Sequence, residues 1–369
     1  MKIALISPAS SIHTVRWANG LAEAGHEVHV ISQHPLYDPF LEEVKVHYFP
    51  FRGILGYFLM APGVKKLLKK IQPDIVNAHY ASGYGTTARL AKPYPYLLSV
   101  WGDDVYGFPF KSPLHKWLVK KNLKAADGIA STSHCMAEQT RSLVPELSNI
   151  SITPFGVEMQ DFAIARPLEV NKKKIVIGTV KGMSAQYGID TLIQSFDLLL
   201  KNLSITHSEI ASQLELRLVG GGNKIEEYKE LSKKLGLTEK VQFVGKVPYS
   251  EVPIELAKLD IYVALSRWDS ESFGVAIIEA GAARRPVLVS DAGGLPEVTL
   301  DGRTGIVVPR ENPEEAARAL EKLVLDPGLR LKMGEAGREH VANTYSWGVC
   351  IQKMEKVYAQ TIDQALTKK

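Results

Sequence analysis

Residues 261–280 read IYVALSRWDSESFGVAIIEA, and this stretch decides the fold. Its opening residues, 261–265, form an apolar run of strand length, and the residues from Phe273 onward have the composition of a helix. A strand that leads through a polar loop into a helix is the repeating unit of a parallel sheet with helices on its faces. The stretch therefore predicts an α/β protein.

The same alternation continues in both directions along the chain. Short runs rich in Val and Ile alternate with amphipathic stretches of helical length. The expected strands are residues 3–7, 28–32, 46–49, 75–79, 96–100, 128–132 and 150–153 in the first half, and 175–179, 214–219, 241–244, 261–265, 287–290 and 305–308 in the second. We therefore expect two doubly wound parallel sheets, one in each half.

The length of 369 residues suits two domains of ordinary size. We expect an N-terminal domain over residues 1–165 and a C-terminal domain over residues 172–346. The polar, proline-bearing segment 153–174 contains the expected linker. The remaining residues, 347–369, are expected to form a helix that packs back toward the N-terminal domain.

The composition is that of a globular cytoplasmic protein. Hydrophobic residues make up 45% and charged residues 23% of the chain. The net charge of +4 is too small to indicate nucleic-acid binding. Cys135 and Cys350 are the only cysteines, without C-x-x-C spacing, so reduced thiols are expected. No apolar run has the roughly 20 residues of a membrane-spanning helix.

The helix expected to begin near Phe273 is a candidate anion site. Ligands of doubly wound sheets bind beyond the carboxyl ends of the strands, and two such domains in series predict a site in the cleft between them. The first backbone N–H groups of the helix, from Phe273 to Val275, would meet a diphosphate. Glu271 and Glu279 flank this point and would accept hydrogen bonds from the hydroxyls of a sugar and a ribose. The alternative is a helix whose acids stabilise its dipole.

The loop after the first expected strand, residues 8–13, lacks the G-x-G-x-x-G pattern of a dinucleotide dehydrogenase. Its short side chains would let backbone N–H groups approach a phosphate, which makes Ser11 a candidate donor-binding residue. A plain turn in which Ser11 caps the following helix is the other interpretation.

Glu271 and Glu279, with Phe273-Gly274 between them, resemble the paired-glutamate motif of the family 4 glycosyltransferases, which are retaining enzymes of the GT-B fold. The resemblance extends through residues 187–193, 218–222, 241–247, 292–297 and 302–309. It covers the second half of the chain and, more faintly, the first. It implies two Rossmann-like domains that face each other across a cleft, the N-terminal one binding the acceptor and the C-terminal one the nucleotide sugar.

The resemblance also implies roles for individual residues. Glu279 would hold the ribose hydroxyls, Glu271 the donor sugar, and the backbone around Val247 the base. Lys181 occupies the place of the family's phosphate-binding arginine, although a solvated lysine after a strand is the alternative. The expected donor-binding residues are Ser11, Lys181, Val247, Glu271, Ser272, Phe273, Gly274, Val275 and Glu279.

Two departures from the family pattern affect the expected chemistry. Tyr187 stands where a second cation is common, and Trp101 follows the strand after which many members have a histidine. Asp103 and His79 are candidates for the role of that histidine, while a buried structural histidine is the other interpretation of His79. The expected catalytic residues are thus Lys181, Glu271, Asp103 and His79. Asp103 and Asp104 would also suit a metal, but GT-B enzymes as a class use none, so neither metal nor cofactor is expected.

The implied activity is transfer of a hexosyl group from a nucleoside diphosphate sugar, most often UDP-linked in this family, with retention at the anomeric carbon. The acceptor would be a hydroxyl of a glycan or lipid-linked molecule, in the synthesis of cell-surface polysaccharide or glycolipid. A nucleotide-sugar epimerase of the same fold and a non-catalytic nucleotide-sugar-binding protein are the alternatives.

Two segments of the N-terminal half combine apolar and basic residues. Residues 49–60 precede the lysine-rich run 65–70, and residues 115–124 repeat the combination. Basic amphipathic surfaces bind anionic membranes, which would place the protein peripherally at the inner face of the plasma membrane. The other interpretation is helices with one face in the core and one in water.

Overall fold

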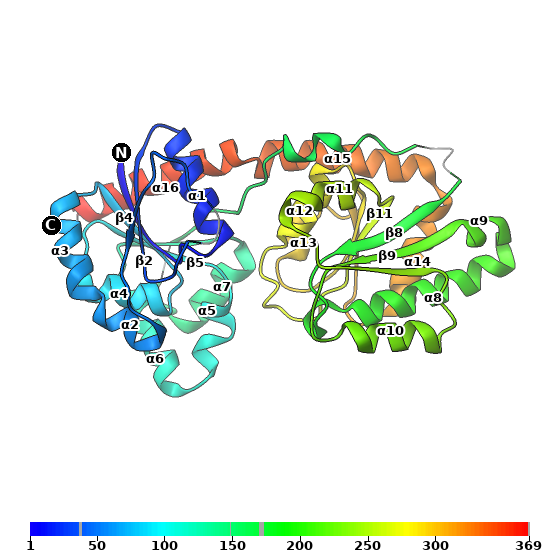
Figure 1. Ribbon diagram of the computed structural model, residues 1–369, viewed down its shortest axis with the longest axis horizontal. Helices are drawn as coiled ribbons and strands as arrows, with labels where there is room; N and C mark the ends of the chain where they lie inside the picture. Colours follow the sequence, from blue (N-terminus) through cyan, green and yellow to red (C-terminus); the bar gives the residue numbers. More distant parts are fainter. Residues whose placement is uncertain (37–38, 148, 170–172, 368–369) are drawn as a thin grey trace. The chain divides into compact units, whose positions relative to one another are not determined.

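The computed structural model describes residues 1–36, 39–147, 149–169 and 173–367, which form two compact units (Figure 1). Unit 1 comprises Met1–Phe155 and Trp347–Lys369, and unit 2 comprises Gly156–Ser346. Unit 2 thus begins earlier than the boundary expected at residue 165, because Val157 pairs with Ser346. Residues 171 and 172 of the expected linker, and residues 368 and 369 of the last helix, lie outside the described residues.

Unit 1 is built on a seven-stranded parallel sheet in the order β3-β2-β1-β4-β5-β6-β7. Its strands are β1 (Lys2–Ile6), β2 (Glu27–Ser32), β3 (Lys45–Tyr48), β4 (Ile75–His79), β5 (Tyr96–Val100), β6 (Gly128–Ser131) and β7 (Ile150–Ile152). In register, Ile3 of β1 lies opposite Val28 of β2 and Ile75 of β4. Helices cover both faces of such sheets, so β4 and β5 in the centre are buried along their whole length.

The helical segments of unit 1 are α1 (Ile12–Glu23), α2 (Gly53–Leu59), α3 (Ala61–Ile71), α4 (Gly83–Ala91), α5 (Asp103–Tyr106), η1 (Phe108–Phe110), α6 (Pro113–Lys124), α7 (His134–Leu143) and α16 (Trp347–Thr367). Helix α16 packs on α1 of the same unit, where the rings of Trp17 and Trp347 meet edge to face with centroids 5.1 Å apart. The hydroxyl of Tyr358 also donates a 3.2 Å hydrogen bond to the amide oxygen of Asn77 on β4. The last helix is therefore part of the N-terminal unit.

Unit 2 contains a six-stranded parallel sheet in the order β10-β9-β8-β11-β12-β13. Its strands are β8 (Ile175–Val180), β9 (Leu214–Val219), β10 (Val241–Gly245), β11 (Ile261–Ala264), β12 (Val287–Ser290) and β13 (Gly305–Val308). All thirteen strands expected from the sequence are present, with ends that differ by at most one residue. The prediction of two parallel doubly wound sheets is confirmed.

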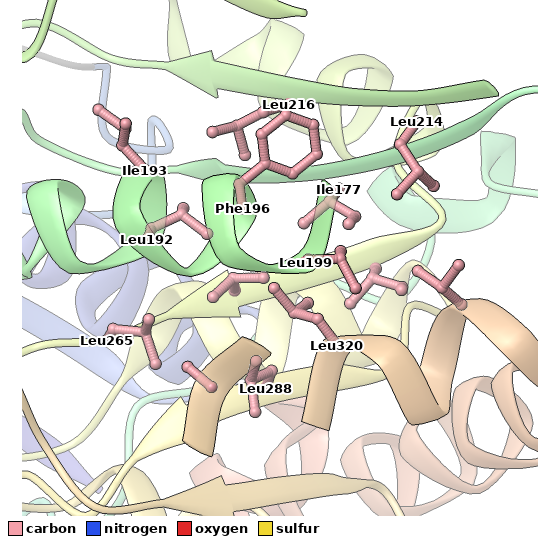
Figure 2. Packing of buried hydrophobic residues seen from close by; sticks show 14 of the residues in the cluster. Ile177, Leu192, Ile193, Phe196, Leu199, Leu214, Leu216, Leu265, Leu288 and Leu320 are labelled. Atoms are coloured by element: carbon pink, nitrogen blue, oxygen red, sulfur yellow. The ribbon is translucent and has the colours of Figure 1, made fainter. Parts of the chain in front are cut away.

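The helical segments of unit 2 are η2 (Asp161–Ile164), η3 (Ala185–Tyr187), α8 (Ile189–Thr206), α9 (Ser208–Gln213), α10 (Ile225–Lys234), η4 (Tyr249–Glu251), α11 (Val252–Ala257), α12 (Val275–Ala282), α13 (Leu295–Val298), α14 (Pro313–Leu325) and α15 (Pro327–Tyr345). Helix α8 presents Leu192, Phe196 and Leu199, at helical spacing, to the sheet (Figure 2). They pack in one buried cluster with Ile177 of β8 and Leu320 of α14. This core fixes β8, and with it the loop that follows.

Each sheet has one switch point, where the strand order reverses direction. In unit 1 it lies between β1 and β4, and in unit 2 between β8 and β11. Ligands of open α/β sheets bind outside the carboxyl ends of the strands at this point. The loops that follow β8 and β11 carry Lys181 and Glu271, so the fold alone brings these two candidates to one place.

Within the described residues, no helix is both long and apolar enough to span a bilayer.

Candidate functional site

Lys181 and Glu271 form a nearly buried ion pair at the switch point of unit 2. Lys181 directly follows β8, and its backbone N–H is held by the carbonyl oxygen of Val219 at 2.8 Å. Its Nζ donates a 2.7 Å hydrogen bond to Oε1 of Glu271, in the loop after β11. The two side chains are 9% and 17% exposed. The solvated alternative for Lys181 is therefore wrong.

The charge of this lysine is stabilised by its neighbours. Burial alone would lower the pKa of Lys181, but the Glu271 carboxylate, together with Tyr262 and Tyr187, more than compensates, and the pKa stands above its usual value. The Nζ of Lys181 also lies 4.6 Å from the centre of the Tyr187 ring, a cation–π contact. Tyr187, at the position of the expected second cation, thus contacts the cation that is present.

Helix α12 begins at Val275, two residues after the predicted start, and Gly274 is its N-cap. The backbone of Gly274 has a φ of 99°, which a residue with a side chain rarely adopts. The first amides of a helix have no partner within the helix and favour an anion. Ser272 and Phe273, 6% and 5% exposed, precede this turn, and the Phe273 ring packs on Tyr345.

Glu279 lies on α12 and is 6% exposed. Its Oε1 accepts a 2.7 Å hydrogen bond from the hydroxyl of Tyr249 in η4, two residues beyond Val247. Val247 is half-buried in the segment after β10. Tyr249 is not among the residues predicted from the sequence, because it lies beyond the motif of residues 241–247 and its pairing with Glu279 joins two distant segments.

Glycines hold the Glu271 loop in place. The N–H of Gly294 donates a 2.9 Å hydrogen bond to the carbonyl oxygen of Glu271. Gly293 has a φ of 50°, and a Cβ there would lie 2.5 Å from the same carbonyl oxygen. The Gly-Gly pair is therefore required because two loops approach through their backbones.

A second glycine-rich loop supports Lys181 in the same manner. The backbone of Gly220 has a φ of 145°, and a side chain there would overlap with the carbonyl oxygen of Lys181. The carbonyl oxygen of Gly221 accepts a 2.9 Å hydrogen bond from the N–H of Met183. A side chain at Gly222 would overlap with the Met183 carbonyl. These glycines let two backbone segments pack directly on each other.

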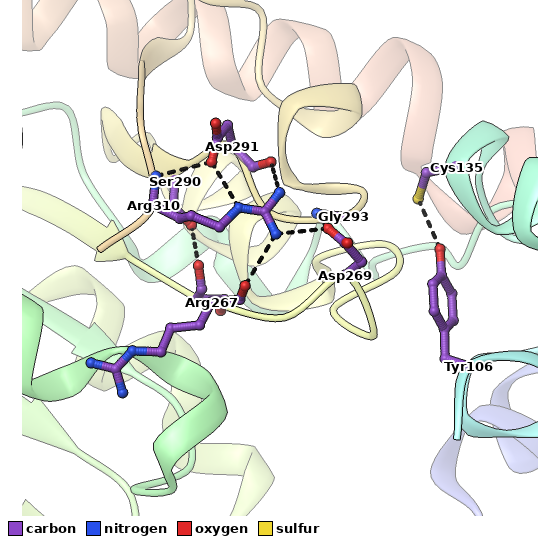
Figure 3. Close-up of polar contacts among 9 residues, drawn as sticks. Tyr106, Cys135, Arg267, Asp269, Ser290, Asp291, Gly293 and Arg310 are labelled. Atoms are coloured by element: carbon purple, nitrogen blue, oxygen red, sulfur yellow. Dashed lines mark hydrogen bonds and ion pairs between the residues drawn. The ribbon is translucent and has the colours of Figure 1, made fainter. Parts of the chain in front are cut away.

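Arg310 ties the Glu271 loop to the ends of β12 and β13 (Figure 3). Its guanidinium donates to the carboxylates of Asp269, at 2.8 Å, and Asp291, at 3.0 Å, and to the carbonyl oxygen of Arg267, at 3.1 Å. Arg267 itself is paired with Asp190 at 2.6 Å. The loop that carries Glu271 is thus held by Asp291 and Arg310, which follow β12 and β13, and by Asp190 of α8.

His79, at the end of β4 in unit 1, has the contacts of a structural residue. It is 1% exposed, and its Nδ1 and Nε2 lie 2.7 Å from the Ser7 hydroxyl and 3.0 Å from the Asn77 amide oxygen. Its ring lies against Trp101, with centroids 4.0 Å apart. Burial, assisted by the charge of His13, lowers the pKa of His79 to about 3. The structural interpretation of His79 is therefore the one that the geometry favours.

The two aspartates at the start of α5 differ in their surroundings. Asp103 is exposed, whereas Asp104 is 1% exposed. The carboxylate of Asp104 accepts hydrogen bonds from the backbone N–H groups of Ala81, Trp101 and Gly102, at 2.7, 3.1 and 2.9 Å. Burial, partly opposed by these bonds, raises the pKa of Asp104 to about 6. Asp104 organises the loop, and Asp103 is the one that reaches solvent.

Ser11 precedes α1 at the switch point of unit 1, but its side chain makes no capping hydrogen bond. Ser11 is the N-cap residue of α1, as the plain-turn interpretation predicts, although its hydroxyl does not cap the helix. Its carbonyl oxygen accepts a 3.1 Å hydrogen bond from the N–H of Val15. Among the described residues, no group of three or more His, Cys, Asp or Glu is placed to hold a metal ion.

Models of known protein families match both halves of the chain. The model described as "Glycosyl transferases group 1" matches residues 161–340, and the one described as "Glycosyl transferase 4-like" matches residues 2–133. The chain is 33% identical, over 279 residues, to a GDP-mannose-dependent alpha-(1-6)-phosphatidylinositol monomannoside mannosyltransferase of Mycobacterium tuberculosis, covering 72% of this chain and 70% of that one. It is 25% identical over 346 residues to an uncharacterized glycosyltransferase of Methanocaldococcus jannaschii, covering 91% of each chain.

Solved structures confirm the fold class. Sucrose-phosphate synthase from Thermosynechococcus elongatus matches with a TM-score of 0.79 at 20% identity, over 98% of both chains. The two parallel-sheet units have the GT-B architecture expected from the sequence.

Proposed function

The chain belongs to the glycosyltransferases of the family 4 type, with the GT-B fold, and on this premise we propose that it transfers a hexosyl group from a nucleoside diphosphate sugar to an acceptor hydroxyl. One observation carries the proposal: the Lys181–Glu271 pair lies at the switch point of unit 2, in the loop that leads into α12. A protonated lysine and the first amides of a helix suit a diphosphate.

Donor binding rearranges this pair. The diphosphate would meet Nζ of Lys181 and the amides at the start of α12, and so replace Glu271 as the partner of the lysine. The Glu271 carboxylate would then accept hydrogen bonds from the hydroxyls of the transferred sugar. Glu279, which accepts a hydrogen bond from Tyr249, would also accept hydrogen bonds from the ribose hydroxyls.

The other donor contacts are assigned to loops at the carboxyl ends of the sheets. The backbone around Val247 would contact the base, and the loop of Ser272 the distal phosphate and the sugar. Ser11 in unit 1 would contribute backbone amides. Asp103, which is exposed, would accept a hydroxyl of the donor sugar, and His79 would support Trp101 without contacting substrate.

The transfer would proceed with retention. The bond between the anomeric carbon and the β-phosphate oxygen breaks, and the acceptor oxygen forms a new bond on the same face. The acceptor proton passes to the departing phosphate. Lys181 and the dipole of α12 stabilise the negative charge that develops on that phosphate, so the proposed reaction uses neither a metal nor a further cofactor.

The acceptor and the donor base are finer parts of the proposal. We propose a glycan or lipid-linked acceptor in cell-surface polysaccharide or glycolipid synthesis. The mycobacterial relative is named as a transferase acting on phosphatidylinositol monomannoside, which supports a lipid-linked acceptor. We propose UDP as the nucleotide of the donor. The name of the same relative states dependence on GDP-mannose, so GDP is the alternative nucleotide to test.

The experiment is a thermal-shift screen of the purified protein against UDP, GDP and ADP and their hexose conjugates. A ligand at one hundred times its dissociation constant stabilises by about 2.7 kcal/mol, so one nucleotide and one sugar should stand out. Glu279→Ala should reduce the shift to less than half at the same ligand concentration, and Glu230→Ala, at an exposed position in α10, should leave it intact. A flat response to every nucleotide would refute donor binding.

Product analysis then tests the reaction. Nuclear magnetic resonance of the product made with a candidate acceptor should show the anomeric configuration of the donor. Inversion would refute retention, and conversion of the donor sugar without any acceptor would identify an epimerase instead.

A further inference from the structure

Unit 1 exposes seven large apolar side chains on α2 and on the consecutive segments η1 and α6. We call these seven residues the α2/α6 face. They are Ile54, Leu55, Phe58 and Leu59 on α2, and Phe110, Leu114 and Trp117 on η1 and α6. Ile54, Leu55 and Leu114 are 75%, 71% and 68% exposed. Such a concentration of apolar surface on a folded unit marks an interaction site.

Both helices are firmly seated on the same neighbour, α4. The Thr87 hydroxyl of α4 donates a 2.7 Å hydrogen bond to the Tyr57 carbonyl oxygen of α2. On the other side, Asn122 of α6 donates to the Thr86 hydroxyl at 2.8 Å and accepts from Arg89 at 2.7 Å. Because these contacts fix the buried sides of α2 and α6, the apolar residues on their outer sides are held in the solvent.

The surroundings of the α2/α6 face are strongly basic. Residues 44–126 contain thirteen Lys and Arg but only three acids, Asp74, Asp103 and Asp104. Asp104 is buried, and Asp74, which is exposed, accepts a hydrogen bond from the backbone N–H of Lys2. The stretches that form α2, α3, η1 and α6 contain no acid at all.

Exposed lysines adjoin the apolar residues on both segments. Helix α3 directly follows α2 and exposes Lys65, Lys66, Lys69 and Lys70. On α6, Nζ of Lys116 lies 5.6 Å from the centre of the Phe110 ring. Long lysine side chains beside exposed apolar groups match the boundary between anionic headgroups and acyl chains.

We propose that the α2/α6 face binds the surface of an anionic lipid bilayer, with its apolar side chains in the acyl boundary and its lysines at the headgroups. The charge distribution selects this occupant over a second copy of the chain. A two-fold dimer through this face would set its lysines against identical lysines, and like charges oppose such an interface. The proposal does not depend on the transfer reaction, because lipid binding is measured without any donor or acceptor.

The test is flotation of the full-length protein with vesicles of phosphatidylcholine containing 30 mol% phosphatidylglycerol, compared with phosphatidylcholine alone. We expect flotation only with the anionic vesicles, and its loss as salt rises. Absence of flotation with anionic vesicles, or equal salt-insensitive flotation with both, would overturn the proposal.

Matched variants assign the binding to the face. Ile54→Ser with Leu55→Ser should weaken partitioning at least about tenfold, whereas Ile205→Ser, at an 87% exposed position in unit 2, should not. Lys120→Gln with Lys121→Gln, in α6, should weaken it about 30-fold at low salt. The control pair Lys233→Gln with Lys234→Gln, in α10, should have no effect. Equal effects of the paired variants and their controls would overturn the assignment.

Two further readouts separate the alternatives. Trp117 should shift its fluorescence to the blue on vesicle binding, and Trp117→Phe should remove that shift while leaving the thermal stability unchanged. The protein could instead form a dimer in solution that the double variant Ile54→Ser with Leu55→Ser dissociates, and show no vesicle binding. Those two results together would show that the α2/α6 face binds a second copy of the chain. That result would overturn the membrane proposal and leave the proposed transferase activity untouched.

Discussion

Nζ of Lys181 and Oε1 of Glu271 are 2.7 Å apart although the two residues are 90 positions apart in the chain. The pair exists because β8 and β11 are neighbours at the switch point of their sheet. Glu271 keeps the lysine charged and in place. In the proposed mechanism an arriving diphosphate would therefore meet a prepared cation, and the carboxylate released from the lysine would bind the hydroxyls of the donor sugar.

Lys181→Ala should lower kcat at saturating donor by about 10²–10³-fold, because the lysine stabilises charge on the leaving diphosphate. The measurement is a steady-state assay with donor and acceptor. Lys201→Ala is the control, since Lys201 also pairs with a carboxylate but is 66% exposed on α8. An unchanged kcat would remove Lys181 from the proposed mechanism.

Glu279→Ala should weaken donor binding by about 1.5–3 kcal/mol, the contribution of hydrogen bonds to a charged group. Tyr249→Phe should weaken it by a smaller amount, about tenfold in Kd, because it removes only the hydroxyl that orients Glu279. Titration calorimetry with the nucleotide checks both. Tyr48→Phe, at a 52% exposed position in unit 1, is the control, and equal affinities throughout would contradict the assigned roles.

Gly293→Ala should destabilise unit 2 by about 2–4 kcal/mol and weaken donor binding, because it adds a clash with the Glu271 backbone to the cost of a positive φ. Gly302→Ala is closely matched, with a φ of 71° and nothing within 4 Å of the added Cβ. It should cost only about 1 kcal/mol. Urea unfolding and donor titration check the pair, and equal losses would disprove the packing argument.

His79 should make the stability of unit 1 depend on pH. Burial lowers its pKa to about 3 in the folded state, whereas the unfolded chain takes up the proton near the usual 6.5. The unfolded state binds more protons between these values, so stability is full above pH 6.5 and falls toward pH 3 by about 1.4 kcal/mol per pH unit. Urea unfolding at several pH values, followed by tryptophan fluorescence, should show a shallower slope for His79→Gln.

The control for this slope is His207→Gln, at an exposed position in unit 2. The slope of each variant is compared with that of the parent, and the difference gives the contribution of one histidine. This comparison is needed because the raised pKa of Asp104 changes the stability in the opposite direction between about pH 4 and 6. Identical slopes for His79→Gln and the parent would contradict the buried, neutral state of His79.

Chelation should leave the transfer rate unchanged. The proposed site meets the diphosphate with Lys181 and helix amides, and not with a divalent cation. Activity is measured before and after dialysis against EDTA, with magnesium or manganese added back as the control. A loss on dialysis that either metal restores would contradict the metal-free proposal.

Local sequence patterns predict the strands well because parallel strands buried on both faces are short apolar runs bounded by polar loops. The sequence predicts the start of α12 two residues too early. Gly274 ends the preceding loop with a positive φ, and an apolar pattern does not encode this conformation. For α2 the sequence left two interpretations open, a basic amphipathic surface and a helix with one face in the core, and the exposure of Ile54 and Leu55 favours the first.

The contacts that orient the candidate site depend on loops that are distant in sequence. Tyr249 reaches Glu279 from the segment after β10, and Arg310 reaches Asp269 from the segment after β13. Neither pairing follows from periodicity or from a motif, because each depends on the conformations of two loops at once. For His79 the sequence left two interpretations open, and only the burial of the ring against Trp101 separates them.

Unit 1 is completed by α16, so its last helix leaves the ribosome after all of unit 2 has been synthesised. The segment 156–346 is continuous in the chain and contains every strand of the second sheet. The N-terminal sheet must wait, with Trp17 and Asn77 uncovered, until Trp347 and Tyr358 arrive. Unit 1, which is synthesised first, is thus completed last. A chain that stops at residue 346 would contain all of unit 2, the candidate donor-binding unit, but would lack helix α16 of unit 1.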